Sequence, residues 1–306
     1  MSTNAKGYAN PGLLIAPDEL AVRLVRRSEA AGSSGSEAAG NSGSEAAGSP
    51  GSAASAPVVL DVRPTEAFAA GHVPGAAHLD LFGMSLIDTS PAPLDAFLWM
   101  IAHLLATRGA GAERTVVVYG EQSGIRAARA FWFLELFGHP DPRLLDGGFR
   151  AWSAAGYPVT TGADAPARAD WSVGRVASRL ATWREARAAV GAEDTVLLDT
   201  RSTGEYRGTV RRARRAGAIP GAVHVEWTRN LDESGAFKPA AALREMYEGA
   251  GVTPDREVIT YCQGGYRAAH GYVALRLLGY PRVRNYLGSW KEWGDREDLP
   301  VERPAE

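Results

Sequence analysis

The stretch "VVLDVRPTEAFAAGHVPGAAHLDL" at residues 58–81 sets the fold, because a version of it returns later in the chain. The second version is "VLLDTRSTGEYRGTVRRARRAGAIPGAVHVEW" at 196–227. Two more pairs follow in the same order: "RTVVVYGEQSGIRAARAF" at 114–131 with "REVITYCQGGYRAAHGY" at 256–272, and "LDGGFRAW" at 145–152 with "YLGSWKEW" at 286–293. Three blocks that recur in one order indicate two homologous domains.

The repeat divides the chain near its middle. A length of 306 residues also suits about two domains. We expect the first domain over 12–158, a linker rich in Pro, Gly and Ala over 159–171, and the second domain over 172–306. The offset between the copies is 142 residues at Tyr119 and Tyr261, and 141 at Arg126 and Arg267. The first copy therefore has one extra residue between these two positions.

Each half has the pattern of an α/β domain. Four short, continuously apolar and β-branched runs suit strands that are buried on both faces of a mainly parallel sheet. They are "VVLDV", "TVVVY", "TVLLD" and "EVITY". Helical patterns lie between them, including "PDELAVRLVRR" from Pro17 and "RAAHGYVALRLLGY" from Arg267. We therefore expect two similar domains, each a parallel sheet flanked by helices.

A second, shorter repeat interrupts the first domain. "SEAAGSSG", "SEAAGNSG" and "SEAAGSPG" follow one another from Ser28 to Gly51, before "SAAS". Such small and polar residues cannot bury enough apolar surface to offset the entropy of ordering. We predict a disordered insertion over about 28–56.

Composition excludes several classes of protein. The net charge of -2 gives no overall attraction to nucleic acid or to an acidic membrane. One cysteine cannot form an internal disulfide, and the six scattered histidines have no metal-ligand spacing. There is no apolar run at the N-terminus and none long enough to cross a membrane. We expect a cytoplasmic protein with no metal, nucleic-acid or membrane partner.

The single cysteine, Cys262, follows the predicted strand "EVITY" and precedes a predicted helix. In α/β sheets, ligand sites lie at this end of the strands. A helix N-terminus and a tight loop through Gly264 and Gly265 both favour a bound anion, and a thiolate is the reactive form of cysteine. We expect a reactive thiolate in an anion-binding cup, closed by Arg267, with Gln263 and Tyr266 at its rim.

A lone cysteine after a buried strand is more often a small core residue. The first copy argues for chemistry, because its equivalent loop is "YGEQSGIR" and places Gly120 opposite Cys262. The two copies share their scaffold and differ at this loop.

With these motifs the chain resembles the tandem-domain rhodaneses, or thiosulfate sulfurtransferases. The resemblance rests on "DVR" and "DTR", on "GHVPGA" and "AIPGAVHVEW", on the loop "CQGGYR", and on "GSWKEW". It implies a non-catalytic first domain and a catalytic second domain. It also implies that Cys262 takes a sulfane sulfur as a persulfide and passes it to cyanide or another thiol. No cofactor is implied beyond that covalent persulfide, and the partners would be a small sulfur donor and an acceptor, including an acceptor protein.

The chain departs from some relatives near the loop. Some animal members have a basic residue at the position of Gly264 and an arginine at that of Glu205. Mercaptopyruvate-using relatives have a different loop after the cysteine. The related dual-specificity phosphatases have a loop one residue longer between cysteine and arginine. Thiosulfate is therefore the first expected donor, and the alternatives are 3-mercaptopyruvate, a non-enzymatic persulfide carrier or sensor, and a phosphatase.

Other residues carry weaker signals. Asp61 with Arg63, and Asp199 with Arg201, recur in both copies, which favours loop hydrogen bonds or ion pairs, although Arg201 is also a possible pocket residue. Trp227 is a second possible pocket residue, with core packing the alternative. We interpret His270 as a scaffold or surface residue. The arginine-rich loop 207–215 is either a solvated loop or a funnel for anions.

Overall fold

The computed structural model of the protein describes residues 3–33, 56–163, 166, 168–169 and 174–305. It contains two five-stranded sheets with the same topology, in the orders β1-β5-β4-β2-β3 and β6-β10-β9-β7-β8. All of their strand pairs are parallel. Asp61 pairs with Tyr119 in the first sheet, and Asp199 pairs with Tyr261 in the second. The predicted pair of homologous α/β domains is confirmed.

The elements of the first domain alternate between strand and helix. They are β1 (Leu14–Ile15), α1 (Pro17–Ser33), β2 (Val58–Asp61), α2 (Thr65–Ala70), β3 (Ala77–His78), α3 (Pro91–Ala106), β4 (Val116–Tyr119), α4 (Ile125–Leu136), β5 (Pro142–Leu145) and α5 (Gly148–Ala154). Two short 3-10 helices, η1 (Thr3–Lys6) and η2 (Pro11–Leu13), precede them.

The second domain repeats this order. Its elements are η3 (Ala177–Arg179), β6 (Leu180–Ala181), α6 (Trp183–Ala188), β7 (Thr195–Asp199), α7 (Thr203–Tyr206), β8 (Val223–His224), η4 (Trp227–Asn230), α8 (Ala240–Gly249), β9 (Glu257–Tyr261), α9 (Tyr266–Leu277), β10 (Val283–Tyr286) and α10 (Ser289–Trp293).

The four apolar runs form the central strands of the two sheets. Every residue of β2 and β4 is buried, and so are the last four residues of β7 and β9. Helices cover both faces of each sheet, so a polar side chain on a central strand would lose its hydration. This explains why these strands are continuously apolar. These strands lead directly into the loops in which the two copies of the repeat share their sequence motifs.

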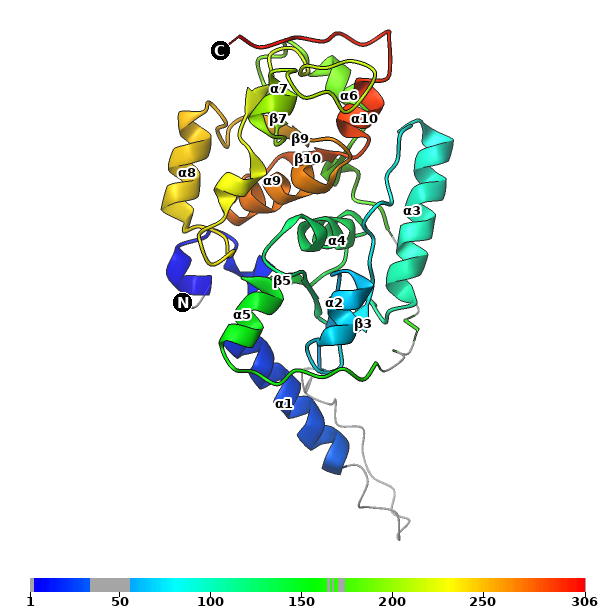
Figure 1. Cartoon of the computed structure of the whole chain (residues 1–306), viewed down its shortest axis with the longest axis vertical. Helices are drawn as coiled ribbons and strands as arrows, with labels where there is room; N and C mark the ends of the chain where they lie inside the picture. Colours follow the sequence, from blue (N-terminus) through cyan, green and yellow to red (C-terminus); the bar gives the residue numbers. More distant parts are fainter. Residues whose placement is uncertain (1–2, 34–55, 164–165, 167, 170–173, 306) are drawn as a thin grey trace, which may run out of the picture.

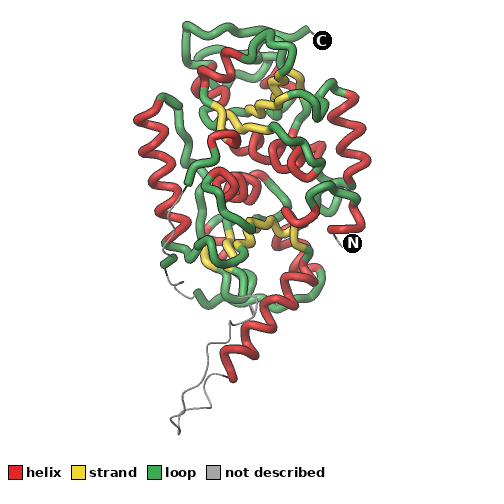
Figure 2. The backbone as a smooth tube through the Cα atoms, turned by 180° about the vertical axis from the view of Figure 1, so that it is seen from behind, coloured by secondary structure: helices red, strands yellow, loops and turns green. Residues whose placement is uncertain are grey.

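Helices α4 and α9 are equivalent in the two copies, and they pack against each other at the centre of the molecule. Figures 1 and 2 show them side by side between the two sheets. Both helices are buried over most of their length. Each helix starts immediately after its domain's loop at the carboxyl end of the central strand. The packing therefore brings both loops to the boundary between the domains.

The N-terminal segment also ties the domains together. The Lys6 ammonium contacts the Asp146 carboxylate of the first domain at 2.5 Å and donates to the Phe237 carbonyl of the second at 2.7 Å. The Tyr8 hydroxyl donates to the carbonyl of Lys238 at 2.7 Å. The predicted first domain, which begins at residue 12, leaves out this segment.

Helix α1 differs from the prediction at its end. It continues to Ser33, so the first six residues of the predicted disordered insertion, 28–33, are helical. Alanine and glutamate have high helix propensity, which lets an existing helix extend into the repeat. The rest of the insertion up to residue 55 lies outside the described residues, as do several residues of the predicted linker. None of the described helices is long and apolar enough to cross a membrane.

Candidate active site

Cys262 lies between β9 and α9, at the carboxyl end of the second sheet, as predicted. Its side chain is buried, with 1% of the residue exposed. Its N–H donates to the Ser289 hydroxyl at 3.1 Å, and its carbonyl accepts from the Trp290 N–H at 2.9 Å. In the first copy, the Gly120 carbonyl accepts from the Phe149 N–H in the same way. The scaffold of the two loops is thus the same.

The backbone N–H groups distinguish the loops. Across the described residues, the N–H groups of residues 263–267 donate no hydrogen bond to the protein. Gly265 has φ of +82°, in the left-handed region, and a Cβ there would lie 2.9 Å from the Leu287 carbonyl oxygen. Only glycine fits both the conformation and the space. The loop thus presents a set of unpaired N–H groups at a helix N-terminus, which is an arrangement that binds anions.

In the first copy two of the corresponding groups are used within the protein. The Ser123 N–H donates to the Gly235 carbonyl at 3.0 Å, and the Gly124 N–H donates to the Gln122 carbonyl at 2.7 Å. The first-domain loop also has no nucleophilic side chain at the cysteine position. Only the second loop combines a thiol with free donors.

Arg267 is where the site differs most from expectation. Its guanidinium forms a bidentate ion pair with Glu205, at 2.5 and 2.9 Å. Burial alone would raise the pKa of Glu205, but the hydrogen bonds and charge of Arg267 outweigh it and lower that pKa to about 2. Arg267 was predicted to close the cup with a fixed positive charge. Glu205 offsets part of that charge and ties Arg267 to α7, so Arg267 also orders the loop, and its role in attracting an anion stays a prediction.

Glu205 is held in place by its own helix. It is the N3 residue of α7, and the Ser202 hydroxyl donates to its carboxylate at 2.9 Å in a capping box. Arg212 of the arginine-rich loop lies 3.3 Å from the same carboxylate, and its carbonyl accepts from the Gln263 side chain at 2.9 Å. Part of that loop therefore lies beside the cysteine loop. Arg215 instead binds backbone carbonyls near the C-terminus, including that of Leu299 at 2.6 Å.

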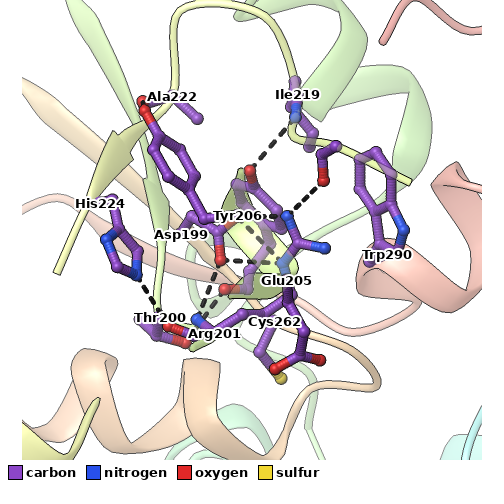
Figure 3. A network of polar contacts seen from close by, with 12 residues as sticks. Asp199, Thr200, Arg201, Glu205, Tyr206, Ile219, Ala222, His224, Cys262 and Trp290 are labelled. Atoms are coloured by element: carbon purple, nitrogen blue, oxygen red, sulfur yellow. Dashed lines mark hydrogen bonds and ion pairs between the residues drawn. The ribbon is translucent and has the colours of Figure 1, made fainter. Parts of the chain in front are cut away.

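The paired Asp-x-Arg motifs are structural, as predicted. Arg201 binds Asp199 at 2.5 Å and the Gly217 carbonyl at 2.7 Å, and its guanidinium carbon lies 4.5 Å from the Trp290 ring centroid (Figure 3). Arg63 makes the equivalent contacts with Asp61, in the first domain. Since Arg201 is engaged in the same way as its copy in the domain without a nucleophile, a place in the pocket gains no support.

The first domain covers the cysteine loop. Tyr266 was expected at the rim, yet it is 9% exposed, and its hydroxyl donates to the Leu81 carbonyl at 2.7 Å. A Cβ on Gly264 would lie 3.3 Å from the Ser85 hydroxyl. The segment around 81–85 belongs to the first domain, so that domain forms one wall of the site. Gln263 stays half-buried at the edge.

His270 is a buried scaffold residue that links the domains. Its Nε2 donates to the Ser123 carbonyl of the first domain at 2.8 Å, and its Nδ1 accepts from the Asn230 amide at 3.1 Å. The Tyr247 hydroxyl donates to the Asn230 amide oxygen, which fixes the orientation of that amide. Trp227 is half-buried and meets the His270 ring edge to face at 5.1 Å, so its contact is with this scaffold. A role for Trp227 as a pocket wall stays a prediction.

His270 makes the stability of the domain boundary depend on pH. Burial lowers its pKa to about 4, from about 6.5 in an unfolded chain. Because the pKa of His270 is lower in the folded protein, the neutral imidazole contributes its full stability above pH 6.5. This contribution is lost as pH falls toward 4. We expect the unfolding free energy to lose up to about 3 kcal/mol over that range. Denaturant unfolding of wild type and His270→Gln at several pH values tests this, and equal pH slopes for both would contradict it.

The predicted site residues omitted two charged side chains that the structure brings to the loop, Glu205 and Arg129. Glu205 was noticed only as a departure from relatives. Arg129 lies on α4 with its guanidinium carbon 3.7 Å from the Tyr266 ring centroid. The signal that points to it is the repeat, because the offset of 141 residues aligns Arg129 with His270. Among the described residues, no group of three or more His, Cys, Asp or Glu side chains has the arrangement of a metal site.

Comparison with known proteins gives one family. The model of the rhodanese-like domain matches residues 49–155 and again residues 182–296. A thiosulfate sulfurtransferase from Pseudomonas aeruginosa is 36% identical over 247 residues, which cover 80% of this chain and 90% of the relative. A thiosulfate sulfurtransferase from Azotobacter vinelandii is 36% identical over 251 residues, covering 81% and 92%. A sulfur carrier protein from Thermus thermophilus is 35% identical over 253 residues, covering 78% and 88%.

Solved structures share the fold. The anaerobic ergothioneine biosynthesis enzyme from Chlorobium limicola superposes with a TM-score of 0.76 at 22% identity, over 98% of this chain and 72% of that chain. At this identity the likeness concerns the fold alone.

Proposed function

The chain belongs to the rhodanese family, whose activity is sulfur transfer, and we propose that it uses thiosulfate as donor and Cys262 as nucleophile. The observation that carries the proposal is the difference between the two loops. The loop with a thiol has unpaired N–H groups at residues 263–267, and the loop without a thiol uses two of the corresponding groups, those of Ser123 and Gly124, within the protein. An anion-binding cup around a cysteine suits a reaction in which the donor, the leaving group and the intermediate are all anions.

The proposed reaction has two steps. In the first, the Cys262 thiolate attacks the outer sulfur of thiosulfate, and the S–S bond of the donor breaks. Its electron pair leaves with sulfite, so the charges of -1 and -2 on the reactants remain -1 and -2 on the persulfide and sulfite. In the second, cyanide or an acceptor thiolate attacks the terminal sulfur of the persulfide and regenerates the Cys262 thiolate. Since sulfite leaves without being protonated, neither step needs a general acid.

The surroundings of the loop support these steps. The N–H groups of residues 263–267 lie at the N-terminus of α9, where the helix dipole is positive. They would therefore stabilise the negative charge of the persulfide between the steps. The Cys262 side chain is shielded from bulk water, which protects a persulfide from side reactions. The cysteine carries the sulfur covalently, so the proposal needs no metal or organic cofactor.

Three other donors or roles remain as alternatives with different outcomes. With 3-mercaptopyruvate, attack at its thiol sulfur would break the C–S bond, and the electron pair would leave on the enolate of pyruvate, which takes a proton from solvent. The naming of one relative as a sulfur carrier protein favours a second role, in which the persulfide is handed to a partner protein. A phosphatase is the least favoured, because the loop "CQGGYR" is one residue shorter than the phosphatase loop and its arginine is paired with Glu205.

Steady-state transfer to cyanide separates these roles. We expect thiocyanate formation with thiosulfate, with kcat/KM at least about tenfold higher than with 3-mercaptopyruvate, and no hydrolysis of p-nitrophenyl phosphate. The reverse preference would replace thiosulfate by 3-mercaptopyruvate as the donor. A chain that takes one sulfur but does not turn over with cyanide would be a carrier.

A further inference from the structure

Arg129 is a buried charge at the boundary between the domains. It lies on α4, in the domain without the nucleophile, and only 1% of the residue is exposed. Its guanidinium stacks on the ring of Tyr266, the fifth residue of the cysteine loop. The first domain thus places a cation directly on the loop that holds Cys262.

No protein group balances this charge. Within the described part of the chain, Nε, Nη1 and Nη2 of Arg129 have no hydrogen-bond partner and no carboxylate at ion-pair distance. An unpaired buried guanidinium destabilises a fold by several kcal/mol unless an anion accompanies it. Arg129 is unusual in this respect, since Arg126 on the same helix pairs with Asp80 at 2.5 Å.

Cys262 lies near enough to act on Arg129 electrostatically. Burial lowers the pKa of Arg129 to about 10, and electrostatic interactions with Tyr266 and Cys262 oppose this lowering. Arg129 therefore remains protonated at neutral pH. Arg267 and Arg212 both lie on the Glu205 carboxylate, whereas Arg129 has no hydrogen-bond partner within the described residues.

The pseudo-symmetry of the molecule supports the same assignment. Arg129 and His270 occupy equivalent positions on α4 and α9, and each reaches across the boundary to the loop of the opposite domain. His270 donates to the Ser123 carbonyl and accepts from Asn230, so its polar atoms are satisfied by the protein. Arg129 faces the loop with the nucleophile, and its polar atoms are left for another partner.

We propose that Arg129 is an anion-binding residue of the sulfur-transfer site, stabilising the Cys262 thiolate, its persulfide and the bound anionic donor. The inference rests on the proposed function. It implies that residues of both domains form the site. Arg129 forms and breaks no bond in either step. It supplies a positive charge that no carboxylate of the described residues offsets.

The test compares Arg129→Met and Arg129→Lys with Arg126→Gln, which removes a half-buried charge, paired with Asp80, from the same helix. The first measurement is the rate of Cys262 alkylation by iodoacetamide as a function of pH, which needs no sulfur donor. We expect the Met variant to move the pH midpoint up by about one unit or more. The Lys variant should keep most of the wild-type behaviour, and Arg126→Gln should move the midpoint by a few tenths of a unit at most because water screens its charge.

Two further measurements separate this role from a structural one. Loading with thiosulfate should slow at least about tenfold in the Met variant, while its melting temperature should stay the same or rise, because a buried unpaired charge is removed. A residue that only supported the fold would lower the melting temperature. If the Met variant does not fold, the Lys variant decides: a preserved midpoint supports the proposal, and a lost one contradicts it.

The outcomes also separate this inference from the proposed function. An alkylation midpoint that is unchanged in the Met variant, or that shifts equally in Arg126→Gln, would overturn the role of Arg129. If the wild-type protein takes no sulfur from thiosulfate, the proposed donor fails, yet the alkylation profile still decides on Arg129. If wild type and the Met variant load at the same rate, the donor stands and the inference fails.

Discussion

Replacing Cys262 with serine is expected to reduce thiocyanate formation by at least about 10⁴-fold. A serine hydroxyl is close in size to the thiol, so the loop keeps its contacts with Ser289 and Trp290. The hydroxyl remains protonated at neutral pH and cannot hold a sulfane sulfur. The described residues include no second cysteine to take over the role, and the full sequence has none either.

The control for this variant is a measurement of its folding stability. Since Cys262 is buried in a loop that is held by backbone hydrogen bonds, the melting temperature of Cys262→Ser should stay within a few degrees of wild type. The activity would be measured with thiosulfate and cyanide at saturating concentrations. Substantial thiocyanate formation by a folded serine variant would show that sulfur transfer does not pass through Cys262.

Replacing Glu205 with alanine should destabilise the protein by about 2–4 kcal/mol. Only 2% of the Glu205 side chain and 17% of the Arg267 side chain are exposed, so the variant leaves a largely buried arginine without its partner. The lower end of the range allows for the partial access of water to Arg267. Denaturant unfolding at neutral pH measures the loss. A matched surface control is Glu248→Ala, which removes an exposed ion pair with Arg244 and should change stability by less than about 1 kcal/mol.

The same pair sets an acid limit on stability. The pKa of Glu205 is about 2 in the folded protein and about 4.5 as its ordinary value. Because the pKa of Glu205 is lower in the folded protein, its carboxylate contributes its full stability above pH 4.5. This contribution is lost as pH falls through 2. Wild type and Glu205→Gln should therefore differ at neutral pH and converge near pH 2. A Glu205→Ala variant as stable as wild type would show that the pair does not hold the loop.

The fold could be predicted from the sequence because the internal repeat is visible in it. "VVLDV" and "TVLLD" have the pattern of buried strands, and Cys262 stands where a strand meets a helix. Those features are local in the chain, so periodicity and loop chemistry are enough to place them. The contrast between "YGEQSGIR" and "CQGGYR" predicted which loop binds an anion, and in the structure the N–H groups of Ser123 and Gly124 donate within the protein while those of residues 263–267 do not.

The charges around the cysteine could not be predicted in the same way. Arg267 pairs with a residue 62 positions earlier, and no local pattern reports such a contact. Glu205 looked like a simple departure from relatives, although it pairs with Arg267 and so offsets part of the charge predicted to close the cup. Arg129 belongs to the domain without the nucleophile, and its place beside Tyr266 depends on how α4 packs against α9. Packing between elements distant in sequence decided all of these contacts.

The central claim is that Cys262 accepts one sulfur from thiosulfate. The most direct test is the intact mass of the reduced protein after incubation with excess thiosulfate, beside Cys262→Ala treated in the same way. We predict a gain of one sulfur atom in the wild type, none in the variant, and loss of that sulfur as thiocyanate when cyanide is added. An unchanged wild-type mass, or an equal gain in Cys262→Ala, would contradict the claim.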